Sequence, residues 1–253
     1  MKKLNSFIQE KLKISETSFM LEKLKITSKS EINHYNYVPE NTDELKELLK
    51  DLIEKRGENA DLNDIDTSKI DNMEGLFIGL NISNINISYW DVSNVENFRT
   101  MFWHCRKFNC NLSNWDMRKA KNISYMFNGC ENFNSLLIWD VSNVDTLMNT
   151  FSDCFSFEGK GLEKWNIKKC QSLYHTFQNC HNFNCDISDW DVSNIKYFGS
   201  CFEDCKNFEY DLSKWNVNAN IENMRDMFTG CKKLIKNKKL PDWWPYRNIL
   251  YLS

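Results

Sequence analysis

Tryptophan recurs through the middle of the chain at a nearly constant interval. The intervals are 25, 24, 26, 25 and 25 residues, and the positions are Trp90, Trp115, Trp139, Trp165, Trp190 and Trp215. Each tryptophan is followed twelve or thirteen residues later by a phenylalanine, then after three more by a cysteine, and after another three by an apolar residue. A weaker copy with Ile65 in the tryptophan position precedes them. The pattern predicts about seven repeats over residues 61–235.

The spacing of apolar residues changes within one repeat. Trp190 and Val192 are two apart, as in a short strand with one buried face. From Ile195 through Phe198 to Cys205 the apolar positions are three and four apart, which is typical of one face of a helix. The sequence therefore predicts an α/β repeat solenoid, a right-handed, leucine-rich-repeat-like stack of strand–helix units in which the six tryptophans form a structural ladder.

The turn between the two predicted elements is polar. Ser93 is in place to cap a following helix, and Glu96 three residues later completes a capping-box pattern. An aspartate or asparagine comes directly after every tryptophan, and we call this set the Asp/Asn row: Asp91, Asp116, Asp140, Asn166, Asp191 and Asn216. If the units stack, the row forms a ladder on the concave face, either as a solvated edge that bonds to neighbouring backbone or as a binding site for a basic or hydroxyl-rich partner.

The repeat from Trp90 to Trp115, W-D-V-S-N-V…M-F…C…F…L-S-x-W, resembles that of BspA-type leucine-rich repeat surface proteins. It is also similar to the 25-residue repeat of mycoplasma lipoproteins. The resemblance implies a leucine-rich-repeat solenoid associated with adhesion and protein binding, and it implies no catalytic residues.

The two ends differ from the repeats. Residues 1–60 are predicted to be an N-terminal segment and helical cap, with a helix from Thr42 to Arg56 preceded by Asn41 and ended by Gly57. Residues 1–20 form a basic amphipathic segment that is a candidate for docking to an assembly or an anionic surface. Residues 236–253 are predicted to be a C-terminal cap, with Trp243 and Trp244 as a hydrophobic lid or, alternatively, an exposed contact patch.

Composition excludes several classes of function. The net charge of −3 and a pI near 5.9 provide no basic field for nucleic acid. No apolar run approaches the roughly 18 residues of a membrane span, and no secretory signal opens the chain. The sequence thus favours a cytoplasmic or a virion- or assembly-associated location over Sec-dependent secretion, with reduced cysteines.

Candidate chemistry is sparse. Cys105 with Cys110 and Cys180 with Cys185 repeat a spacing beside histidines, but these pairs do not form a four-ligand zinc set. The four histidines do not recur in the repeats, so no cysteine has an evident activating base. We therefore predict no catalytic residue, no metal and no cofactor, and one cysteine per repeat as a small core residue.

Two functions remain. The first is a non-enzymatic protein-binding or adhesion module with an unidentified protein partner. The second is a structural component of a larger assembly, for example of a phage or a cell surface, in which the repeats act as a spacer.

Overall fold

The computed structural model describes residues 35–252. The chain divides into two units, Met1–Tyr37 and Val38–Ser253. The predicted docking segment, residues 1–20, lies outside the described residues. The fold below is that of the second unit.

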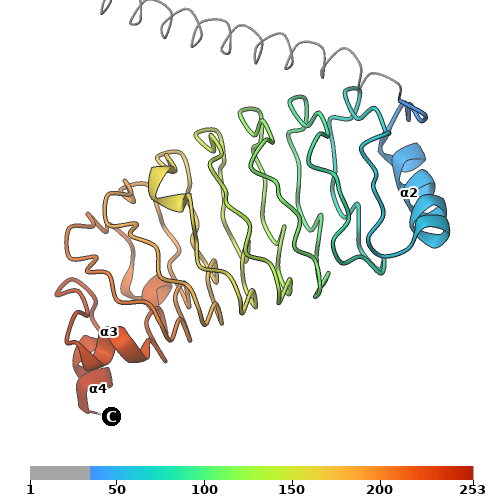
Figure 1. Cartoon of the computed structure of the whole chain (residues 1–253). Coiled ribbons are helices and arrows are strands. Elements are labelled where there is room, and N and C mark those ends of the chain that lie inside the picture. The colour runs from blue at the N-terminus through green and yellow to red at the C-terminus, as the bar shows by residue number, and fades with distance from the viewer. Residues whose placement is uncertain (1–34, 253) are drawn as a thin grey trace, which may run out of the picture. The chain divides into compact units, whose positions relative to one another are not determined.

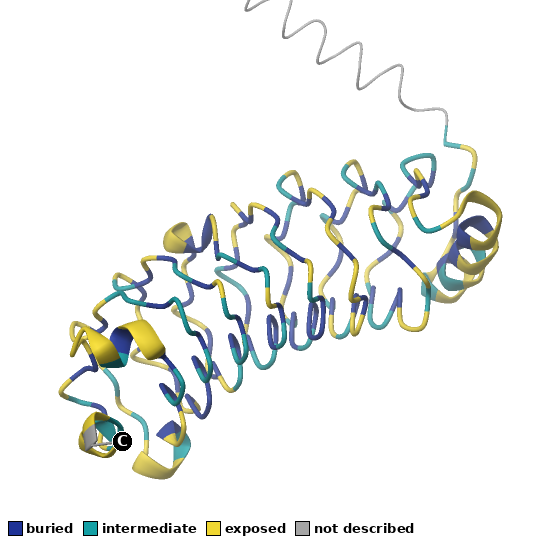
Figure 2. Cartoon of the chain, turned by 60° about the horizontal axis from the view of Figure 1, so that its bottom comes forward, coloured by how far each residue is buried: buried dark blue, intermediate teal, exposed yellow. Residues whose placement is uncertain are grey.

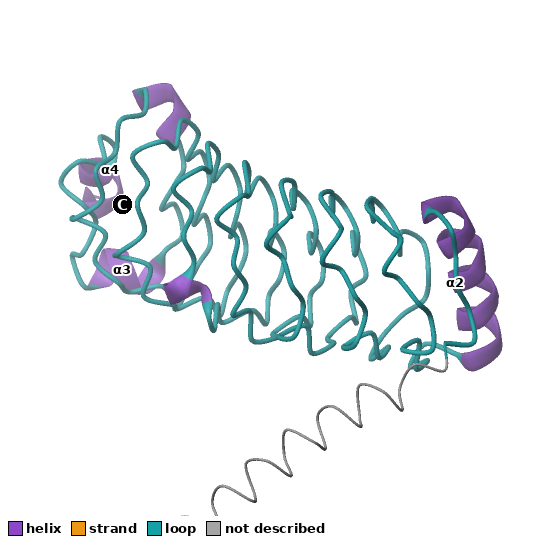
Figure 3. Ribbon diagram, turned by 90° about the horizontal axis from the view of Figure 1, so that it is seen from above, coloured by secondary structure: helices purple, strands orange, loops and turns teal. Residues whose placement is uncertain are grey.

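The repeats of this unit wind as successive turns of chain that lie side by side (Figure 1). Backbone hydrogen bonds join each turn to the next, about 25 residues further along, for example from Phe98 N to Asn122 O at 2.8 Å. Pairing is parallel but limited to isolated bridges, such as Asn72 with Asn97 and Asn97 with Asn122. Figure 3 accordingly shows the repeats almost entirely as loops and turns.

The predicted strand–helix units are wrong. Among the described residues there is no strand longer than a single bridge, and the segments predicted as repeat helices are turns. These segments follow each tryptophan and stack as a column that we call the turn column: residues 98–105, 123–130, 147–154, 173–180, 198–205 and 224–231.

Two sets of hydrogen bonds hold the turn column instead of a helical ladder. Alternate N–H groups bond to the next repeat, as Thr100 N does to Ser124 O at 3.1 Å and Phe102 N to Met126 O at 2.9 Å. The intervening N–H groups bond three residues back, as Met101 N does to Phe98 O at 3.1 Å. An α-helix needs a hydrogen bond from each N–H to the carbonyl four residues back in the same segment. In the turn column the N–H groups bond instead to the neighbouring repeat or to the carbonyl three residues back.

The backbone conformation explains why the turn column is not helical. Two positions of the turn column lie in the left-handed region, as Thr100 does at φ 54° and His104 at φ 57°. A left-handed residue every fourth position ends an α-helix before its first turn is complete. The predicted cap at Ser93 is likewise part of a turn, because its N–H donates to Asp91 Oδ1 at 3.0 Å.

Regular helices lie outside the turn column or at its last segment. The described residues hold three α-helices, α2 (Thr42–Arg56), α3 (Lys232–Lys236) and α4 (Arg247–Leu252), and two 3-10 helices, η1 (Leu162–Lys164) and η2 (Ile221–Met224). Helix α2 coincides with the helix expected from the sequence. Asn41 Oδ1 accepts the N–H of Glu44 at 3.0 Å, and Gly57 ends it at φ 85°.

Buried residues recur in every repeat along the stack (Figure 2). The repeat phenylalanines stack ring on ring with centroids 5.1–5.7 Å apart, from Phe77 through Phe102 and onward to Phe228. The six repeat tryptophans are 3–4% exposed. Each donates its Nε1–H to a backbone carbonyl of the preceding repeat, as Trp190 does to Leu162 O at 2.9 Å. Every repeat therefore covers the apolar side of the one before it.

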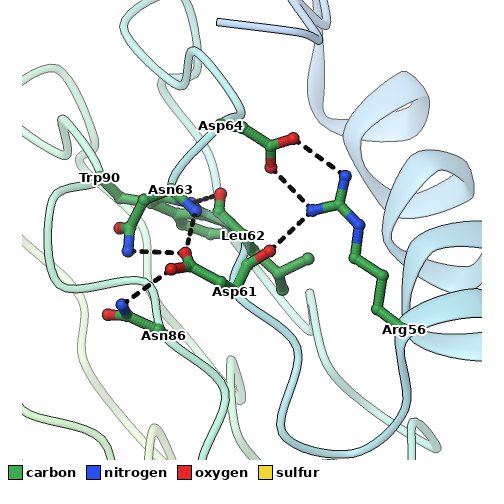
Figure 4. A network of polar contacts seen from close by, with 7 residues as sticks. All are labelled: Arg56, Asp61, Leu62, Asn63, Asp64, Asn86 and Trp90. Carbon is green, nitrogen blue, oxygen red and sulfur yellow. Dashed lines mark hydrogen bonds and ion pairs between the residues drawn. The ribbon is translucent and has the colours of Figure 1, made fainter. Parts of the chain in front are cut away.

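Both ends of the stack are covered. Helix α2 buries Leu45, Leu49 and Leu52, and Arg56 anchors it to the first repeat. The Arg56 guanidinium donates to Asp61 O at 2.7 Å and to both carboxylate oxygens of Asp64 (Figure 4). At the other end Trp243 stacks on Trp215 with centroids 6.4 Å apart.

Candidate functional site

Side chains of the Asp/Asn row stabilise local turns of the backbone. The carboxylate or amide oxygen of most of its members accepts the backbone N–H two residues later, which closes a tight turn after each tryptophan. In Asp191, Oδ1 accepts both the N–H and the hydroxyl of Ser193, at 3.1 and 2.6 Å. The row is largely exposed, so its carboxylates also face solvent.

Neighbouring members of the row share one arginine. Arg118 bonds to Asp116 through Nη2 at 2.6 Å, and this hydrogen bond is the main cause of the lowered pKa of Asp116. The pKa of Asp140 is lowered chiefly by Ser142, and Arg118 lowers it further. Arg118 and the turns thus favour the ionised form of these carboxylates. The assignment of this row as a binding site remains a prediction.

A second exposed surface lies on the turn column and was missed by the sequence reasoning. We call it the aromatic cluster: Arg99, Trp103 and His104, which are exposed, together with the half-buried Tyr125 and the buried Asn128. Trp103 is 38% exposed, and its Nε1–H donates to Asn128 Oδ1 at 2.9 Å. The Arg99 guanidinium lies 5.9 Å from the centroid of the Tyr125 ring. The available signal was that these positions vary between repeats while their neighbours recur.

The aromatic cluster is held in place by its surroundings. The rings of Trp103 and His104 lie 4.5 Å apart, and Arg99 also pairs with Glu74 at 3.4 Å. A Cβ atom on Gly129 would lie only 2.5 Å from His104 Nδ1, so the imidazole rests against that glycine of the next repeat. A large aromatic side chain fixed by a hydrogen bond loses little conformational freedom on binding.

The cysteines form a third column, inside the stack. All ten are free and buried. In each repeat the thiol lies against the carbonyl of the phenylalanine one repeat earlier, for example Cys180 Sγ 2.9 Å from Phe151 O. Desolvation raises the pKa of Cys105 to about 12 and that of Cys180 well above its usual value. Protonated, buried thiols are poor nucleophiles and poor metal ligands.

The comparisons with known proteins give one match. The model of a family described as "Mycoplasma protein of unknown function, DUF285" matches residues 43–159 and 145–248. The chain belongs to this family. The family is related to BspA-like repeat proteins. No curated protein and no solved structure matches the chain.

The two matches of the DUF285 family model together run from within α2 to beyond Trp243. They therefore include both coverings of the stack as well as the repeats. Over the part of the chain that the structure describes, no helix combines the length and apolar character needed to cross a membrane. In residues 35–252 no group of three or more histidine, cysteine or acidic side chains is placed to hold a metal ion.

Proposed function

We propose that this DUF285 chain is a non-enzymatic module that binds a protein partner through the side of its repeat stack. The observation that carries the proposal is the aromatic cluster. Tryptophan, tyrosine and arginine are the residues that most often dominate the energetics of protein interfaces. Here the exposed Trp103 and Arg99 and the half-buried Tyr125 come from two adjacent repeats.

The construction of the stack favours a contact on its side. Helix α2 covers one end and Trp243 and Trp244 cover the other, so neither terminal repeat presents an open face. The columns of tryptophan, phenylalanine and cysteine are determined by packing between repeats. Recognition of a particular partner must then use positions that packing leaves free, and the aromatic cluster occupies such positions.

The chemistry of the cluster indicates what the partner presents. An apolar side chain would cover the exposed part of the Trp103 ring, and an acceptor such as a carboxylate would meet Arg99, whose side chain is half exposed in its pair with Glu74. The resemblance to BspA-type surface proteins supports the same class of function, adhesion or protein binding. The Asp/Asn row is proposed as a second contact, for basic groups of the partner.

Site-specific photo-crosslinking tests the proposal. A photoreactive phenylalanine analogue replaces Trp103 in one variant and Tyr89 in a matched control, because Tyr89 is also exposed, at 62%, but lies outside the cluster. We expect one protein, identified by mass spectrometry, to be crosslinked in the native cells from position 103 and not from position 89.

Affinity for the purified partner supplies the quantitative test. Trp103→Ala should weaken binding by about 10- to 100-fold, the loss typical of a hot-spot residue. Tyr89→Ala should change the affinity less than twofold. Equal crosslinking from both positions, or unchanged affinity in both Trp103→Ala and Tyr125→Ala, would contradict the proposal and favour the spacer function.

A further inference from the structure

A depression of about 250 Å³ opens on the turn column in the last three repeats. Two tyrosines contribute to its lining, and we call them the tyrosine wall; residues of the final repeat contribute the rest, which we call the charged wall. Its lining includes Tyr174, Tyr197, Gly199, Glu222, Arg225 and Asp226. The two tyrosines are 41% and 48% exposed, so their rings are available to a ligand.

Gly199 is part of the lining of the depression. Its carbonyl accepts the ladder bond from His175 N at 2.9 Å, the bond that Ser124 O accepts from Thr100 N and Arg225 O from Ser200 N. Other residues at this position of the repeat carry side chains: Arg99, Ser124, Met148, Tyr174 and Arg225. Gly199 does not lie in the left-handed region, so its backbone does not require glycine. What the glycine provides is space for the Tyr174 ring.

The Tyr174 ring lies over that space. A Cβ atom built on Gly199 would lie 3.0 Å from Tyr174 Cε2 and 3.8 Å from Arg225 O. The Tyr174 ring therefore occupies the place that a side chain at this position would take, and it packs against the Gly199 backbone as part of the lining of the depression. Its volume is below the roughly 300–1,000 Å³ of pockets that enclose drug-sized molecules, so it suits a single ring-sized group.

The charged wall of the depression indicates which kind of ligand it favours. Glu222 and Asp226 would repel an anion, and Arg225 between them would repel a cation. All three are exposed. A neutral ligand with many hydroxyl groups meets no such penalty, because hydroxyls donate to carboxylates and accept from guanidinium. The two tyrosine rings provide an apolar surface for the C–H face of the same ligand.

We propose that this depression is a carbohydrate-binding site for one neutral sugar ring. A sugar combines an apolar C–H face with a periphery of hydroxyl groups, which matches the tyrosine wall and the charged wall together. A neighbouring depression of about 290 Å³ shares Arg225 and Asp226 and is lined also by Tyr246 of the C-terminal segment. A disaccharide that reaches both depressions should bind more tightly than a monosaccharide.

The inference does not rest on the protein-binding proposal, because it uses different residues and a different ligand. The probes are methyl glycosides of glucose, galactose, mannose and N-acetylglucosamine and their disaccharides, added to the full-length chain. Saturation-transfer NMR and titration calorimetry measure binding, with an expected Kd in the millimolar range, roughly 1–10 mM, for the preferred monosaccharide.

Gly199→Met introduces the side chain that Met148 carries at the same position of another repeat. It displaces the Tyr174 ring from its place against Gly199 and should therefore weaken sugar binding at least tenfold. Tyr197→Ala removes an exposed wall residue and should have a similar effect without touching the core. Tyr89→Ala and Trp103→Ala are the controls and should leave sugar binding within twofold. Thermal melting of each variant shows that the stack remains folded.

Each outcome of the binding experiments either supports or overturns the proposed sugar site. Saturable binding of one glycoside that is lost in Gly199→Met and Tyr197→Ala, with melting unchanged, supports the site. The proposal is overturned if none of the glycosides or disaccharides binds at 50 mM, or if binding is equal in the wild-type chain and both variants. It is also overturned if N-acetylarginine amide, a cationic probe, binds the depression and the sugars do not.

Discussion

Replacing Thr100 by glycine should raise the free energy of unfolding by about 0.5 to 1 kcal/mol. Thr100 lies in the left-handed region at φ 54° although it is β-branched. We take the conformational penalty for such a residue as about 2 kcal/mol. Glycine removes this penalty but loses about 0.8 kcal/mol through the greater freedom of the unfolded chain. Loss of the bond from Thr100 Oγ1 to Arg99 O, 2.7 Å long and exposed, subtracts about 0.5 kcal/mol more.

The matched variant Thr100→Ala shows whether the gain in stability comes from the left-handed conformation of this residue. Alanine removes the β-branch but still carries a Cβ, so it keeps much of the left-handed penalty and should be less stable than glycine at this position. In a helix the order is reversed, since glycine is about 1 kcal/mol less favourable than alanine. The relative stability of the two variants therefore distinguishes the turn column from the helix that the sequence pattern predicts.

Equilibrium unfolding in urea and thermal melting measure the effect. A gain of 1 kcal/mol raises the melting temperature of a domain of this size by about 2–4 °C. Circular dichroism of each folded variant checks that the native signal is retained. If Thr100→Ala proves more stable than Thr100→Gly, residues 98–105 do not adopt the turn conformation described above.

Five further predictions concern the columns, the Asp/Asn row and the cap. Trp190→Ala should lower the free energy of unfolding by about 3–5 kcal/mol in urea titrations, because a 4% exposed ring leaves a cavity between repeats. In thiol labelling the native cysteines should react slowly at pH 8 and all ten should react after denaturation; rapid native labelling of Cys130 or Cys205 would contradict their burial. Because the pKa of Cys105 rises from 9.0 to about 12, its contribution to stability is complete below about pH 9 and is lost as the pH rises toward 12, which alkaline melting curves should show. Changing Asp91, Asp116, Asp140 and Asp191 together to asparagine should alter stability by less than about 1 kcal/mol, since the amide oxygen accepts the same N–H, yet should weaken binding of a basic partner; unchanged affinity would remove the row from the interface. Arg56→Lys should cost about 1–2 kcal/mol and speed hydrogen exchange in α2, because lysine cannot make the bidentate contact to Asp64.

The sequence reveals the repeat and its buried positions but misassigns the local structure. Apolar residues three and four apart, such as Phe198, Cys201 and Cys205, fit one face of a helix. They fit equally a series of turns closed by bonds three residues back, as from Cys201 N to Phe198 O at 3.0 Å. Hydrophobic spacing reports which side chains point inward. It does not report whether the N–H groups bond within a segment or to the neighbouring repeat.

A second pattern in the sequence did carry the missing information. The residue just before the repeat cysteine is of a type that tolerates the left-handed region: His104, Gly129, Asp153, Asn179, Asp204 and Gly230. All six have positive φ. Glycine, asparagine, aspartate and histidine in one position of every repeat predict a turn there, because these residues are enriched at positive φ and are poor helix formers.

The candidate sites were harder to predict, for a physical reason. The Asp/Asn row recurs, so the sequence identified it, and its recurrence is accounted for by the turns that it closes. The aromatic cluster and the depression at Gly199 depend on single residues in adjacent repeats, such as Arg99 over Tyr125 and Tyr174 over Gly199. Such contacts follow only once the register of the ladder is established, because a shift of one position would separate the partners.

Trp243 shows what the stack requires of each added repeat. It follows Trp215 by 28 residues, so the regular period does not reveal it. Its indole nevertheless donates to Leu212 O at 3.0 Å and stacks on Trp215 with an interplanar angle of 11°, as the repeat tryptophans do along the same column. The requirement is thus an indole placed over the previous turn with a carbonyl to bond, and the chain length between tryptophans can change as long as this contact is met. Because the interior accepts so little chemical variation and the loops accept more, differences in binding among DUF285 proteins should lie on the exposed sides of the stack, where the aromatic cluster and the Gly199 depression are found.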